Sequence, residues 1–136
     1  MEALMSELAV SRRIALSDYP PKPGHPPTLS RPALTPRVGS TDIGAVRQIA
    51  PPGVAGPRHS HDRDEVLIMI EGSLRVETDS GAIDVMPGDA VLLPARAAHR
   101  LTSTGTIDAQ WFVVSRSGLR FYLPDGTEVP APDWTQ

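Results

Sequence analysis

The 136-residue chain contains no cysteine. This absence excludes disulfide bonds, thiolate metal ligands and cysteine nucleophiles. Any bound metal must therefore be held by nitrogen and oxygen ligands. Such ligands suit Fe(II), Mn(II), Ni(II), Cu(II) or Zn(II) better than Cu(I) or an iron–sulfur cluster.

The chain also lacks a long apolar run and a cluster of positive charge. No segment reaches the length that a membrane-spanning helix needs. The net charge is −3, and the 13 basic residues are scattered along the chain. We therefore expect neither a nucleic-acid nor a membrane partner. The first ten residues carry Glu2 and Glu7 and no basic n-region, so they do not resemble a signal peptide, and we expect a cytoplasmic protein.

Proline is abundant and unevenly placed. Seven of the 15 prolines lie in residues 18–37, which predicts an extended arm rather than a helix or a central strand. Before the arm, the partial apolar stripe over residues 2–17 predicts a short helix. We therefore divide the chain into a leader over residues 1–42 and one domain over residues 43–136.

The arm contains apolar residues that could anchor it. Leu29, Leu34 and Val38 lie among its prolines. An exposed sheet edge favours pairing with another chain unless something covers it. We expect the arm to cover such an edge, on its own domain or on the partner subunit in a homodimer.

From residue 43 onward the pattern changes to short β-strands separated by turns. Gly, Pro and Asp punctuate apolar or alternating segments, which predicts an all-β sandwich or barrel. The expected strands are VRQIA, VLIMIE, SLRVET, AIDVM, AVLL, HRLTS, TIDAQWFVVS and LRFYL.

The segment Gly53–Gly72 contains two histidines and a carboxylate at close spacing. His59 and His61 are two residues apart, so their side chains share one face of a β-strand. Glu65 follows four residues later. These three residues form most of a metal site, and His99 is a candidate for the fourth ligand.

These residues resemble the two conserved motifs of the cupin superfamily. Gly53-x5-His59-x-His61-x3-Glu65-x6-Gly72 matches the first motif at every defining position. In the second, Gly88-x5-Pro94-x-Arg96-x2-His99-x3-Ser103 matches at Gly, Pro and His. The resemblance implies a double-stranded β-helix, or jelly-roll, barrel that holds one divalent metal through His59, His61, Glu65 and His99.

The second motif departs from the cupin pattern at two positions. Arg96 replaces a glycine, and arginine would be strained at a positive φ, so we expect the turn there to take another shape. Ser103 replaces an asparagine and should face the same side as His99. Arg58 should point away from the metal, and Leu67 and Met69 should line the pocket if Glu65 points inward. Trp111 and Phe112 should face opposite sides, in an order that the pattern leaves open.

The resemblance implies a function only in outline. Three imidazoles and a carboxylate leave two positions open on a six-coordinate ion, so a substrate and O2 could bind side by side. We therefore expect an enzyme acting on a small organic molecule, with dioxygenase-like oxygenation first and Fe(II) as the first choice of metal. Glu65 could instead act as a general base. The alternatives are a non-redox isomerase or polyketide-type cyclase and a non-enzymatic small-molecule binding cupin.

Overall fold

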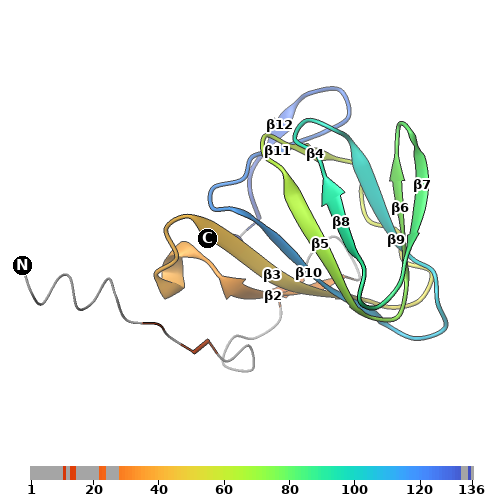
Figure 1. Ribbon diagram of the computed structural model, residues 1–136. Coiled ribbons are helices and arrows are strands. Elements are labelled where there is room, and N and C mark those ends of the chain that lie inside the picture. Colours follow the sequence, from red (N-terminus) through yellow and green to blue (C-terminus); the bar gives the residue numbers. More distant parts are fainter. Residues whose placement is uncertain (1–10, 12, 15–21, 24–27, 133–134, 136) are drawn as a thin grey trace, which may run out of the picture.

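The computed structural model describes residues 11, 13–14, 22–23, 28–132 and 135 (Figure 1). Most of the regular structure in these residues is β-strand, which confirms the predicted all-β class. Of the helix expected over residues 2–17, only residues 11, 13 and 14 are described, and they are not helical. In the part of the chain that the structure describes, no helix is long and apolar enough to span a bilayer.

A large sheet forms one side of the barrel. The strand order is β1-β2-β3-β10-β5-β8, and each neighbouring pair of strands is antiparallel. The strands of this sheet are β1 (Lys22–Pro23), β2 (Leu29–Leu34), β3 (Ile43–Ala50), β5 (Glu65–Glu71), β8 (Ala90–Leu93) and β10 (Ala109–Arg116). A 3₁₀ helix over Pro36–Val38 follows β2.

Two three-stranded sheets complete the barrel. Their orders are β7-β6-β9 and β12-β11-β4. Their strands are β4 (Ser60–His61), β6 (Leu74–Thr78), β7 (Gly81–Val85), β9 (His99–Ser103), β11 (Phe121–Tyr122) and β12 (Glu128–Val129). In Figure 1, β6, β7 and β9 lie opposite the large sheet, and β4, β11 and β12 gather at one end.

Alternation along the strands separates the core from the surface. On β5 the side chains of Glu65, Leu67 and Met69 are buried, and those between them are exposed, as expected for a strand with one face in a core. The main buried cluster draws on several strands. Its members are Ala50, Leu67, Met69, Leu74, Val76, Val85, Leu93, Ala109 and Trp111.

Gly72 closes the first motif for a steric reason. Its φ is +74°, and a Cβ at this position would lie 2.6 Å from the carbonyl oxygen of Asp108. Only glycine fits such a close approach at a positive φ. The motif glycine therefore lets the chain turn out of β5 against the segment that leads into β10.

The proline-rich arm covers a sheet edge, as predicted. β2 pairs antiparallel with β3, from Leu29 opposite Ile49 to Leu34 opposite Ala45. Leu34 is half-buried and lines the barrel cavity, which agrees with its expected part as an anchor. Leu29 is 41% exposed, so the expectation that it anchors the arm was wrong.

Candidate metal centre

The barrel brings the three motif histidines together from two segments of the chain. His61 lies on β4, and His99 begins β9. His59 precedes β4 and forms an antiparallel bridge with His99: each backbone N–H donates to the other's carbonyl, at 3.1 and 2.8 Å. Backbone pairing therefore sets the positions of the imidazoles before any ligand binds.

Each imidazole is oriented by a hydrogen bond between its Nδ1 and a backbone carbonyl. The partners are Pro57 for His59 at 2.8 Å, Arg120 for His61 at 3.2 Å and Ala97 for His99 at 3.2 Å. A carbonyl can only accept, so Nδ1 must carry the proton, and the neutral ring keeps its lone pair on Nε2. This is the tautomer that a histidine needs to bind a metal through Nε2.

Glu65 contacts two of these rings. Its Oε1 lies 2.9 Å from His61 Nε2 and 3.7 Å from His99 Nε2. The carboxylate therefore approaches the two rings at their Nε2 atoms, which are the atoms that a metal would bind when Nδ1 is held by a backbone carbonyl.

The spacing of the cluster fits one metal ion. Candidate ligand atoms of His59, His61 and His99 all lie within 4.8 Å of one another. Atoms bound to one ion at about 2.0–2.2 Å lie roughly 3–4 Å apart, so the widest of these separations would shorten slightly on binding. The three imidazoles therefore form a cluster able to hold a metal, and Glu65 approaches the same place.

Burial keeps two of the imidazoles neutral. Desolvation lowers the pKa of His99 to about 4, and the neighbouring His59 acts in the same direction. Desolvation also lowers the pKa of His59. Neutral imidazole is the form that binds metal, so at neutral pH these rings are ready to accept an ion.

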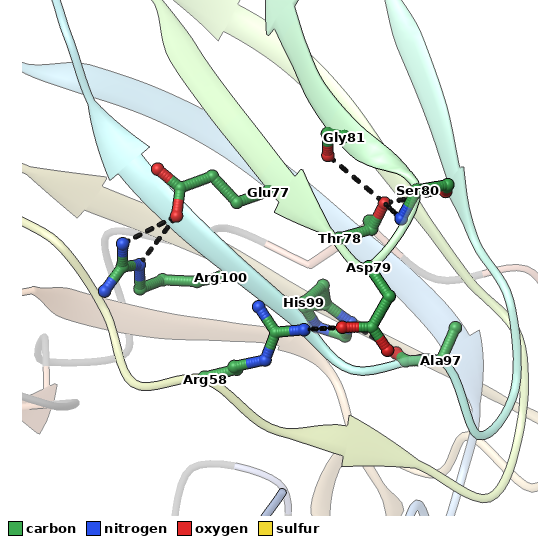
Figure 2. Close-up of polar contacts among 9 residues, drawn as sticks. All are labelled: Arg58, Glu77, Thr78, Asp79, Ser80, Gly81, Ala97, His99 and Arg100. Atoms are coloured by element: carbon green, nitrogen blue, oxygen red, sulfur yellow. Dashed lines mark hydrogen bonds and ion pairs between the residues drawn. The ribbon is translucent and has the colours of Figure 1, made fainter.

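The residues beside the histidines point away from the site, as predicted for Arg58. Figure 2 shows Arg58 paired with Asp79 and Arg100 paired with Glu77, on the side of β9 opposite the His99 ring. Arg100 donates from Nε and an Nη to one oxygen of Glu77, at 3.1 and 2.6 Å. Alternation along β9 thus separates a charged outer face from the imidazole face.

The Asp62–Asp64 turn connects to two neighbouring loops through hydrogen bonds. Asp62 Oδ1 accepts a hydrogen bond of 2.9 Å from the backbone N–H of Arg120. Arg120 in turn supplies the carbonyl that orients His61. Asp64 Oδ1 accepts from the N–H of Ala95 at 2.8 Å. Sequence reasoning missed this support, because nothing in the first motif points to residue 120.

The expectation that Arg96 changes the shape of its turn was wrong. Arg96 has a φ of 68°, so the turn keeps the conformation that suits glycine. Its guanidinium carbon lies 4.9 Å from the centroid of the Tyr122 ring, and its N–H donates to the carbonyl of His61 at 2.7 Å. A cation–π contact and this hydrogen bond offset the backbone strain.

A cavity of about 460 Å³ extends from the histidines into the barrel. Ser103 lines it on the same side as His99, as predicted, and Trp111 rather than Phe112 lines its wall. Leu67 and Met69 face the interior but lie in the packed core and do not line the cavity, so that expectation was wrong. Strand alternation identified the face of β5 on which these side chains lie, but not whether they reach the cavity or stay in the packed core.

Phe121, like Arg120, is a residue of the site that was not predicted from the sequence. It lines the cavity, and its ring centroid lies 4.4 Å from that of His61 and 6.1 Å from that of His59. Its position depends on the two-residue pairing of β11 with β4. Such a short pairing has no recognisable sequence pattern.

The fold and the site agree with a match to the family model for the cupin domain. The match covers residues 46–115, just over half of the chain, and includes all four motif residues. The chain therefore belongs to the cupin family. No curated protein sequence matches it.

Solved structures with the same fold are similar to most of this chain. The polyketide cyclase RemF from Streptomyces resistomycificus has 20% identity and a TM-score of 0.73, covering 93% of this chain and 90% of its own. A sugar phosphate isomerase of the cupin superfamily from Silicibacter pomeroyi has 23% identity and a TM-score of 0.71, covering 84% and 82%. An oxalate decarboxylase from Bacillus subtilis has 23% identity and a TM-score of 0.67, covering 79% and 30%. At these identities the likeness establishes the fold.

We predict that Asp62 supports the site through the backbone of Arg120. Asp62→Ala removes the acceptor that holds this segment, so His61 loses its fixed orientation and zinc affinity should fall about tenfold. Asp62→Asn keeps the acceptor oxygen and removes only the charge, so its affinity should stay near that of the wild type. Competition with a chelating dye measures both. Equal losses in the two variants would show that charge, not the hydrogen bond, is what matters.

Proposed function

We propose that this cupin is a metal-dependent enzyme that acts on a small organic molecule. His59, His61, Glu65 and His99 would hold one divalent transition metal, with Fe(II) first and Mn, Ni, Cu or Zn as alternatives. The observation that carries the proposal is the convergence of three imidazoles and the Glu65 carboxylate at one place in the wall of a cavity. Dioxygenase-like oxygenation is the leading reaction.

The residues around the site would have different roles in the reaction. A bound Fe(II) would supply Lewis acidity and positions for substrate oxygens and O2. Glu65 is buried beside two imidazoles, so it either completes the ligand set or accepts a proton from the substrate. Trp111 and Phe121 line the cavity and would exclude water from the bound substrate.

A non-redox isomerase or cyclase is the second candidate. Its support is the similarity to a polyketide cyclase and to a sugar phosphate isomerase. The same four residues would then hold a metal that acts only as a Lewis acid. A small-molecule binding cupin without catalysis is the third.

The metal site is tested by metal content. Protein purified without chelators should contain about one divalent ion per chain, and His61→Ala and His99→Ala should each lose most of it. His25→Ala, a histidine in neither motif, is the matched control and should retain the metal. Glu65→Gln should lose as much as the histidine variants if Glu65 is a ligand, and less if it is mainly a base. Unchanged metal content in both His61→Ala and His99→Ala would show that the site is misassigned.

Oxygen dependence separates the two reaction classes. For any compound that the Fe(II)-loaded protein converts, we expect conversion to stop under argon and after replacement of Fe(II) by Zn(II). Oxygenation consumes O2, whereas cyclisation and isomerisation do not. Product formation followed by chromatography in air and under argon makes the comparison. Equal turnover in both would reject the oxygenase and favour the second candidate.

We propose further that the protein is a homodimer that pairs through the outer face of the large sheet. Val66, Ile68 and Ile70 on β5 and Leu92 on β8 are exposed there, and Val66 is directly opposite Leu92. A contiguous apolar patch of this kind is typical of an interface. Ile68→Lys should halve the mass measured by light scattering, whereas Ile83→Lys, at an exposed position on β7, should not change it. A wild-type protein of monomer mass would contradict the proposal.

A further inference from the structure

The cavity beyond the histidines carries little charge. Apart from the histidines and Glu65, Arg116 is the only charged residue among the described residues that line it. Arg116 is exposed, and it follows Ser115, which is paired with Glu65 on the inner face of the sheet. Strand alternation therefore directs the Arg116 side chain to the outer face. Among the residues that the structure describes, no side-chain cation therefore points into the interior toward an anionic ligand.

Two polar side chains of the cavity wall, those of Trp111 and Gln48, are hydrogen-bonded to each other. Trp111 Nε1 donates to Gln48 Oε1 at 2.9 Å, and Gln48 Nε2 donates to Ser30 Oγ at 3.2 Å. Val113 and Leu101 continue the wall with aliphatic surface. A ligand in this part of the cavity therefore meets mainly apolar atoms, whose burial favours an apolar partner.

Aromatic surface also lies next to the metal centre. The Phe121 ring packs edge-on against His61 and is nearly parallel to His59, with an interplanar angle of 22°. Among the described residues, Ser103 Oγ makes a single long contact of 3.5 Å, with the carbonyl of Ala50. It can therefore hydrogen-bond a neutral hydroxyl or carbonyl of a ligand.

We propose that the cavity takes an uncharged molecule with a ring system. Its hydroxyl or carbonyl oxygens face the metal centre, and its rings pack along the wall from Phe121 to Trp111. This assignment rests on the metal site of the proposed function and adds the class of substrate. A carboxylate or phosphate deep in the cavity would lose its hydration with no cation to replace it.

Three diols that present the same metal-binding group test the assignment. They are catechol, 2,3-dihydroxynaphthalene, which adds a ring, and 3,4-dihydroxybenzoate, which adds a carboxylate. Calorimetric titration into the Zn(II)-loaded protein avoids oxidation of the diols. The added ring should tighten binding by about tenfold or more through burial of apolar surface, and the added carboxylate should weaken it. Dihydroxybenzoate binding as tightly as dihydroxynaphthalene would overturn the proposal.

A pair of valines on one strand provides the matched variants. Val113 lines the cavity, whereas its neighbour Val114 faces the other side of β10. Val113→Thr should weaken dihydroxynaphthalene binding several-fold with unchanged zinc content, and Val114→Thr should change neither. Equal effects of the two variants would contradict a binding mode along this wall.

Zinc content measured on each sample separates the two proposals. Protein that retains no zinc would contradict the metal site. The metal-free protein still tests the cavity, because the added ring should raise affinity by a similar factor there. Zinc-loaded protein that prefers dihydroxybenzoate would leave the metal site standing and reject only the substrate class.

Discussion

The site depends on one constraint: a buried imidazole has a single proton when it is neutral, and the backbone determines where that proton lies. In all three histidines Nδ1 donates a hydrogen bond to a backbone carbonyl, which holds the proton on Nδ1. The carbonyls are those of Pro57, Ala97 and Arg120. The Nε2 atoms of His61 and His99 then face the Glu65 carboxylate. Burial lowers the pKa of His59 and His99, and neutral imidazole is the form that binds a metal.

Backbone hydrogen bonds elsewhere in the barrel hold the three histidines in this arrangement. The reciprocal backbone bonds of His59 and His99 join the two motifs, and β11 brings the Arg120 carbonyl to His61. Two of the three orienting carbonyls lie two residues before their histidine, so they come with the local chain conformation. The third comes from a distant segment and needs the Asp62 hydrogen bond. We infer that His61 is the histidine whose orientation depends most on tertiary structure.

Much of this could be predicted from the sequence. Alternation and turn residues identified most strands, and the segments AVLL and HRLTS match β8 and β9 to the residue. The spacing of His59, His61 and Glu65 also placed these side chains on the inner face of the barrel. The predictions that failed concerned how deeply a side chain is buried and whether distant contacts offset a strained backbone. Leu67 has the predicted face but lies in the packed core and does not line the cavity. Arg96 keeps a positive φ because Tyr122 and His61 supply contacts that no local pattern reveals.

The central claim is that the fold directs the Nε2 atoms of three histidines at one ion. Long-range proton–nitrogen NMR of the histidine rings in the Zn(II)-loaded protein tests it most directly, with His→Ala variants to assign the signals. The account predicts that His59, His61 and His99 all carry their proton on Nδ1 and that all three Nε2 signals shift when zinc is added. A ring protonated at Nε2 in the zinc-loaded protein, or fewer than three shifted signals, would contradict it.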